Sequence, residues 1–191
     1  MEQTWRWFGP KDDVKLWEIR QTGATGIVTA LHDIPYGEIW PVAAIEERQR
    51  IIAEAGLVWS VVESLPIHER VKLNEGDQRS IFDNYRTSMR NLAACGIRTI
   101  CYNFMPVIDW TRTELDHRLP NGASALRFDA ALFAAFDIWM LARPGAEADH
   151  HPDAIRRGKA WHAKASEADK AQLLAAIMAG LPGAYDRYDI A

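Results

Sequence analysis

The chain has 191 residues, of which 48% are hydrophobic and 25% are charged. These proportions are ordinary for a globular protein and exclude a largely disordered chain. The formal net charge is −4, from 22 basic and 26 acidic residues. This balance argues against nucleic acid and anionic membranes as partners, because both need clustered lysine and arginine.

No targeting segment is visible at the start of the sequence. The first residues, Met-Glu-Gln-Thr-Trp, lack the basic region and apolar stretch of a secretory signal. All apolar runs are shorter than the roughly 18 residues that a membrane helix requires. Two cysteines, Cys95 and Cys101, are too few for a disulfide framework in a chain of this size. We therefore expect a cytoplasmic protein with no membrane partner.

Three β/α repeats are predicted in the first half of the chain. Continuous apolar runs predict strands at residues 24–31, 57–64 and 97–104. Apolar side chains at helical spacing predict helices at residues 42–55 and 77–94. Strands without polar alternation indicate a parallel sheet that is buried on both faces. We expect Val28, Val61 and Ile100, or their immediate neighbours, on its inner face.

The alternation of strands and helices stops after residue 104. The polar, turn-rich stretch at 109–121 is predicted to contain no strand. Apolar faces predict three further helices, at residues 128–141, 153–163 and 166–179. His150 and His151 lie between the first two and lack metal-ligand spacing, so a solvated loop is predicted there. Three parallel strands cannot close a barrel, and a complete (β/α)8 barrel typically has about 250 residues.

Polar side chains follow the three predicted strands at their carboxyl ends. His32, Glu63 and Asn103 occupy these positions, and the carboxyl ends of parallel strands carry the site chemistry in β/α folds. Each of the three alone is equally consistent with capping a strand or satisfying loop backbone. Because all three fall at one edge of the sheet, we interpret them as lining a shared pocket.

Trp110 and Arg112 lie in the loop that follows the third predicted strand. An arginine can bind a carboxylate through two parallel N–H bonds, and a neighbouring tryptophan can line a sugar ring. The alternative is a surface arginine that pairs with Asp109 or Glu114. The sequence contains no glycine-rich phosphate-binding loop.

Specific motifs extend over nearly the whole chain. The longest is Cys-Gly-Ile-Arg-Thr-Ile-Cys-Tyr-Asn-Phe-Met-Pro-Val-Ile-Asp-Trp-Thr-Arg-Thr at residues 95–113. The first ten residues, Met-Glu-Gln-Thr-Trp-Arg-Trp-Phe-Gly-Pro, form another. Shorter motifs occupy residues 23–32, 56–64, 126–129, 143–149 and 179–183. Together these segments resemble the bacterial mannonate dehydratase family.

The resemblance implies a barrel of the xylose-isomerase-like group. We therefore expect the α/β class, with the N-terminal three β/α units of a TIM-type (β/α)8 barrel followed by a helical insertion. The barrel is expected to be incomplete in this chain. Residues 1–191 would form a single partial domain, with the three β/α units at 1–106 and the loop and helical insertion at 107–191.

The resemblance also implies a hydro-lyase of hexuronate catabolism that converts D-mannonate, a small sugar acid, to 2-dehydro-3-deoxy-D-gluconate. Fe(II) or Mn(II) is the implied cofactor, and a divalent metal would stabilise the developing enediolate. Its ligands are expected mainly in the C-terminal part of the family's sequence, so we assign no metal ligand and no catalytic acid or base here. Five residues are assigned to substrate binding, namely Arg112, Trp110, His32, Glu63 and Asn103.

Two alternatives stay open. In the first, the chain is a catalytically inactive truncated fragment. In the second, it belongs to a metal-dependent sugar isomerase or epimerase of the same barrel group. An isomerase of aldoses would have no use for an arginine that binds a carboxylate. Because an open sheet exposes the edge of the strand at 97–104, we also expect a homo-oligomer or association through exposed strand edges.

Overall fold

The structure is a computed structural model that describes residues 1–104 and 110–179. These residues fall into two compact units, unit 1 (residues 1–104) and unit 2 (residues 110–179). No helix in the described part of the chain is long and apolar enough to cross a bilayer. Both cysteines are free thiols.

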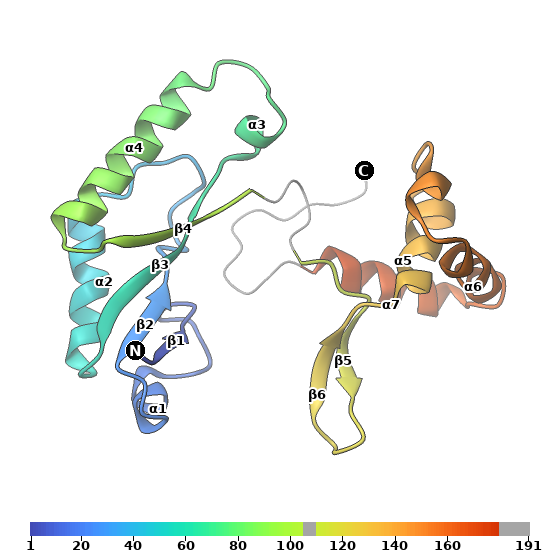
Figure 1. Cartoon of the computed structure of the whole chain (residues 1–191), viewed down its shortest axis with the longest axis horizontal. Coiled ribbons are helices and arrows are strands. Elements are labelled where there is room, and N and C mark those ends of the chain that lie inside the picture. The colour runs from blue at the N-terminus through green and yellow to red at the C-terminus, as the bar shows by residue number, and fades with distance from the viewer. Residues whose placement is uncertain (105–109, 180–191) are drawn as a thin grey trace. The chain divides into compact units, whose positions relative to one another are not determined.

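Unit 1 is built on a four-stranded parallel sheet in the order β1-β2-β3-β4 (Figure 1). Its strands are β1 (Thr4–Arg6), β2 (Gly26–Thr29), β3 (Val58–Pro66) and β4 (Thr99–Asn103). Its helices are α1 (Leu16–Gln21), α2 (Val42–Glu54), α3 (Glu69–Lys72) and α4 (Arg79–Ala94). The three predicted strands and the two predicted helices of this region are confirmed as β2, β3, β4, α2 and α4.

β1 is a strand that the sequence pattern does not predict. It has only three residues, too few for a period of two to stand out from the surrounding sequence. It pairs in parallel with β2, with Arg6 opposite Val28. The next residue, Trp7, donates its main-chain N–H to the Val28 oxygen at 2.9 Å. Arg6 is therefore the last residue of a strand at the edge of the sheet.

One face of the sheet carries the core of unit 1. Ile27 from β2, with Val62 and Leu65 from β3, are at most 3% exposed and pack with side chains of α2 and α4. The buried residues of these helices include Ile45 and Ile52 of α2. Burial of such side chains stabilises the fold by about 1.5–3 kcal/mol each. The core therefore lies between the sheet and these helices.

The opposite face is half-buried or exposed, so the expectation of burial on both faces is wrong for the described residues. Arg6, Val28 and Val61 are register partners and lie on this face, with Thr99 of β4 continuing the row. Ile100 is instead the partner of Val62 and packs against the core. The cause is that the core lies on the other side of the sheet, and Val28 and Val61 are not among the side chains that pack with it in the described part of the chain.

Unit 2 contains a β-hairpin and a group of helices (Figure 1). Its elements are β5 (Glu114–Arg118), β6 (Ser124–Arg127), α5 (Ala130–Ala135), the π-helical turn η1 (Phe136–Met140), the 3-10 turn η2 (Ala146–Asp149), α6 (Pro152–His162) and α7 (Glu167–Met178). The predicted helices at 153–163 and 166–179 are confirmed as α6 and α7. The helix predicted at 128–141 is α-helical over α5 and continues as η1.

The prediction of no strand at 109–121 is wrong, because β5 lies within it. β5 pairs with β6 in an antiparallel hairpin. Asn121 and Gly122 occupy the connection, and Gly122 has a φ of 85°, a conformation that glycine adopts without steric cost. An Asn-Gly pair between two extended segments is a hairpin signal, and the polar side chains around it mask that signal.

Phe136, Leu173 and Ile177 form the buried core of unit 2. They come from η1 and α7, and partly buried side chains of α5 and α6 pack against them. Where α5 and α6 cross, a Cβ atom on Gly158 would lie 2.5 Å from the main-chain oxygen of Ala131. Only glycine fits this close approach of the two helices.

A buried carboxylate fixes the loop that follows η1. Asp137 is 4% exposed and accepts hydrogen bonds from Arg143 Nε at 2.8 Å and Nη2 at 2.7 Å. His150 Nε2 lies 2.8 Å from the same carboxylate. Hydrogen bonding to Arg143, and then to His150, holds the pKa of Asp137 below its usual value. The prediction of a solvated loop is therefore wrong for His150, whose ring also packs edge-on against Phe133.

We predict that Asp137→Asn weakens unit 2. The change removes the negative charge that both Arg143 and His150 face, and we expect the opening free energy of α5 and η1 to fall by about 1–3 kcal/mol. Amide hydrogen exchange of these segments measures it. Asp149→Asn is the matched control, because Asp149 contacts the same Arg143 from an exposed position, where such a pair contributes about 0–1 kcal/mol. Equal losses in the two variants would contradict the assignment.

The edges of the sheet in unit 1 generate a second prediction. Among the described residues, neither β1 nor β4 has a strand partner on its outer side. Unpaired N–H and C=O groups of an edge strand can pair with another chain, and Tyr102 of β4 is 68% exposed. We predict that the purified 191-residue chain self-associates and that Tyr102→Lys reduces the oligomeric fraction.

Size-exclusion chromatography with light scattering measures this fraction. Met89→Lys is the matched control, because Met89 is also an exposed apolar residue of unit 1 but lies on α4. This control should leave the oligomeric fraction unchanged. A monodisperse wild-type monomer, or the same effect from both lysines, would rule out association through β4.

Candidate functional site

Side chains from the first three strands of unit 1 and the loops after them lie next to one another. Arg6 donates a hydrogen bond from Nη1 to the main-chain oxygen of Glu63 and lies 3.7 Å from the Glu63 carboxylate. The Arg6 guanidinium is also 4.8 Å from the centre of the Phe8 ring. The centres of the Phe8 and His32 rings are 6.0 Å apart. We call these four residues the strand-end cluster; two of them, His32 and Glu63, are among those assigned from sequence.

His32 has the most unusual environment in this cluster. Both of its ring nitrogens are buried and have no hydrogen-bond partner. Its pKa is lowered from 6.5 to about 4, first by burial and then by the positive charges of Arg6 and Arg48. The ring is therefore neutral at pH 7. A neutral imidazole offers one N–H donor and one acceptor nitrogen that point in different directions, so it can pair with two hydroxyl groups of one ligand.

Asn103 lies at the end of β4, beside the cluster. Its side-chain amide donates a hydrogen bond to Ser64 Oγ at 3.0 Å, which joins the ends of β4 and β3. Ser64 directly follows Glu63 on β3. Asn103 is half-buried. The structure therefore places it at the same edge of the sheet as Glu63, one strand farther along.

Trp110 and Arg112 belong to unit 2. Trp110 is 66% exposed. Arg112 is 7% exposed, its Nη2 donates to the main-chain oxygen of Ala179, and its Nε and Nη1 are buried without a partner. The alternative of a surface arginine is thus wrong, and Glu114 pairs with other side chains. Asp109 lies outside the described residues.

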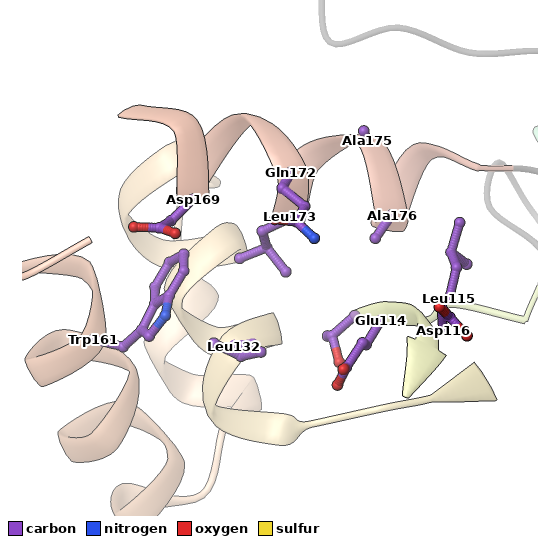
Figure 2. A pocket seen from close by; sticks show the side chains of 11 residues that line it. Glu114, Leu115, Asp116, Leu132, Trp161, Asp169, Gln172, Leu173, Ala175 and Ala176 are labelled. Atoms are coloured by element: carbon purple, nitrogen blue, oxygen red, sulfur yellow. The ribbon is translucent and has the colours of Figure 1, made fainter. Parts of the chain in front are cut away.

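Unit 2 also contains a pocket of about 530 Å³ (Figure 2). Its lining combines apolar side chains with three carboxylates and includes Leu132, Trp161, Leu173, Glu114, Asp116 and Asp169. None of the described residues that line it is basic. Like charges repel most strongly where water is partly excluded, so this pocket disfavours an anionic ligand. The strand-end cluster, which contains a guanidinium, is the better candidate site for an anionic ligand.

Arg6 and Phe8 are the members of the cluster that sequence reasoning missed. They flank Trp7, which is 3% exposed and lies in the core. Alternation between one buried and two partly exposed side chains is typical of a strand with one buried face. The signal was present in Arg-Trp-Phe, but it is only three residues long.

Comparisons with known proteins agree on one family. A sequence model described as D-mannonate dehydratase (UxuA) matches residues 1–189. A mannonate dehydratase from Chromohalobacter salexigens is 57% identical over 191 residues, which are 100% of this chain and 49% of that protein. A mannonate dehydratase from Marinomonas sp. is 53% identical over 190 residues, again 100% of this chain and 49% of that protein. The chain spans about half the length of the curated relatives it matches.

A solved structure is also similar to the chain. It is the crystal structure of mannonate dehydratase from Streptococcus suis serotype 2, with a TM-score of 0.65 and 39% sequence identity. The match covers 96% of this chain and 50% of that one. The similarity therefore extends to nearly all of the fold described above.

The environment of His32 predicts a pH dependence of stability. Between pH 4 and 6.5 the unfolded chain binds a proton at His32 that the folded chain does not, so stability rises with pH through this window. The shift corresponds to roughly 3 kcal/mol between pH 7 and pH 4. His32→Phe, which cannot titrate, should flatten this part of the profile, measured as urea unfolding at several pH values.

His162→Phe is the control, because His162 stacks on Trp139 in unit 2 and not in the strand-end cluster. It should leave the His32-dependent slope in place. Nuclear magnetic resonance of the His32 ring gives the midpoint directly. A midpoint near pH 6.5 would show that the His32 ring is solvated and would contradict its burial.

Proposed function

Because this chain belongs to the D-mannonate dehydratase family, we propose that it supplies part of a hydro-lyase that dehydrates D-mannonate to 2-dehydro-3-deoxy-D-gluconate. The observation that carries the proposal is the family match over residues 1–189, which includes every member of the strand-end cluster. The reaction removes a proton from C2 and the hydroxyl group from C3, and the enol rearranges to a ketone. Its substrate is a small, polyhydroxylated anion, and we place the enzyme in the cytoplasm.

We further propose that β1–β4 are consecutive strands of a TIM-type barrel. Each strand pairs with the next along the chain and all are parallel, as in a (β/α)8 barrel. In this arrangement the half-exposed face with Arg6 and Val61 is the inner face. Residues 1–191 then form one partial domain, with 107–191 as the loop and helical insertion.

The strand-end residues would bind the hydroxyl groups of the substrate. Neutral His32 would donate from one ring nitrogen and accept at the other. The carboxylate of Glu63 would accept hydrogen bonds from hydroxyl groups, and its side chain is 49% exposed. The amide of Asn103 would bind a further hydroxyl from the neighbouring strand. These contacts hold the sugar chain extended along the edge of the sheet.

We also propose that Trp110 and Arg112 contact the substrate. The exposed indole of Trp110 is available to line the sugar ring or chain. Arg112 has two buried nitrogens without partners, and leaving such donors unpaired costs about 1–3 kcal/mol each. A substrate oxygen at this point would satisfy them.

The family resemblance implies Fe(II) or Mn(II), and the described residues do not fit such a centre. Within residues 1–104 and 110–179, no three His, Cys, Asp or Glu side chains gather in a way that could hold a metal ion. We propose that the ligands come from the part of the family's sequence that this chain does not cover.

An assay for the keto acid tests the proposed function. The chain is extended by the part of the Chromohalobacter salexigens relative that lies beyond the match, and the product is incubated with D-mannonate and Mn(II). We predict formation of 2-dehydro-3-deoxy-D-gluconate and no conversion of D-mannose, an uncharged aldose. Conversion of the aldose alone would favour an isomerase, and no keto acid would contradict the proposal.

Metal analysis of the unextended chain completes this test. The 191-residue chain should retain far less than one equivalent of manganese or iron after dialysis, whereas the extended protein should retain about one equivalent. Stoichiometric metal on the 191 residues alone would show that the ligands lie within them.

A further inference from the structure

We infer that Arg6 binds the carboxylate of the sugar-acid substrate and thereby sets the preference of this site for aldonates over uncharged polyols. The inference rests on the proposed function, whose substrate class it specifies. It assigns to Arg6, in the strand-end cluster, a role that sequence reasoning gave to Arg112. Arg6 suits this role because its side chain is held on two sides and its neighbours suit hydroxyl groups.

The Arg6 guanidinium is fixed on two sides. Nη1 donates to the main-chain oxygen of Glu63, and the ring of Phe8 lies against the guanidinium at 4.8 Å. The side chain remains 32% exposed. A guanidinium has five N–H donors in a rigid plane, so the contact of Nη1 leaves the Nε and Nη2 edge for a ligand. That edge matches the two oxygens of a carboxylate.

The charge on Arg6 is only partly neutralised. Its nearest acid is Glu63, at 3.7 Å, which is longer than a close ion pair, and the Glu63 side chain is 49% exposed. Burial lowers the pKa of Arg6 below its usual value, and Glu63 offsets part of this effect. A desolvated cation attracts an incoming anion more strongly than a fully hydrated one. A substrate carboxylate would therefore stabilise Arg6.

Arg48, the other arginine whose positive charge acts on His32, is already engaged. Arg48 is 6% exposed and donates from Nη1 to the main-chain oxygen of Ala30 at 2.7 Å. Its guanidinium lies 5.6 Å from the Trp7 ring, which belongs to the core. Arg48 thus contributes positive charge near His32, but its buried guanidinium does not offer a pair of N–H groups to a ligand. Arg6 is the cation of the strand-end cluster that a ligand can reach.

His32 and Glu63 determine which other groups of the ligand the cluster can bind. His32 has a buried donor and a buried acceptor nitrogen without partners, and Glu63 has an exposed carboxylate. Both suit hydroxyl groups and neither suits a second anionic group, because Glu63 is negative and His32 is neutral. One guanidinium beside two hydroxyl-binding groups fits a polyhydroxylated monocarboxylate. It does not fit a sugar bisphosphate or a dicarboxylate.

Binding by the 191-residue chain itself tests this inference without requiring turnover. The chain is titrated with D-mannonate, and separately with D-mannitol, which has the same carbon skeleton but a hydroxymethyl group in place of the carboxylate. Nuclear magnetic resonance follows the Arg6 Nε–H and the His32 ring. We predict saturable shifts of both signals with D-mannonate and at least about tenfold weaker binding of D-mannitol, which corresponds to about 1.4 kcal/mol.

Variants of Arg6 show whether the discrimination depends on this residue. Arg6→Gln should weaken D-mannonate binding by about tenfold or more and make the two ligands nearly equal. Arg6→Lys keeps the charge but loses the planar fork, so its affinity should fall between the two. Arg86→Gln is the matched control, because it removes a charge of unit 1 from α4, where Arg86 pairs with Asp83. It should bind like the wild type.

Any of three outcomes would contradict the inference. It fails if the wild-type chain gives no shift with D-mannonate, if D-mannitol binds equally well, or if Arg6→Gln binds as the wild type does while Arg112→Gln does not. Failure of the proposed function looks different, since it is the absence of keto acid from the extended protein. If the extended protein makes keto acid and its Arg6→Gln variant keeps KM unchanged, the proposed function stands and this inference fails.

Discussion

The parallel register of β1–β4 is the constraint on which the candidate site depends. Register partners share a face, so Arg6, Val28 and Val61 lie on one side of the sheet, and Trp7 and Val62 point into the core on the other. The pairing that buries the core therefore also brings Arg6 towards Glu63 and His32. A slip of one residue in β1 would exchange the roles of Arg6 and Trp7. Such a slip is disfavoured because it would bury a guanidinium and expose an indole.

Elements with many residues were predictable from the sequence, and short ones were not. β3 and α4 have nine and sixteen residues, enough for an apolar run or a helical period to exceed chance. Gly56, with a φ of 73°, ends α2 as an αL cap would. β1 has three residues and depends on β2 for its hydrogen bonds, so its strand character is set by tertiary pairing. The β5–β6 hairpin was hidden by polar side chains at exposed positions.

The candidate site was predictable to the extent that it follows from topology. Carboxyl ends of neighbouring parallel strands meet at one edge, and this rule placed His32, Glu63 and Asn103 together. The same rule could not identify Arg6, because the sequence pattern did not predict β1, the strand that carries it. Nor could it predict the burial of Arg112, because that residue packs against the end of α7 in unit 2, a contact between segments about 67 residues apart.

The two units also divide the chemistry between them. The described lining of the unit 2 pocket includes three carboxylates and no basic residue, whereas the strand-end cluster of unit 1 combines a cation, an anion and a neutral imidazole. A crystal structure of the chain with D-mannonate tests this division most directly. We predict that the substrate carboxylate lies within hydrogen-bond distance of the Arg6 guanidinium and that the substrate hydroxyl groups contact His32 and Glu63. Density for the carboxylate at Arg112, or in the pocket beside Trp161, would contradict it.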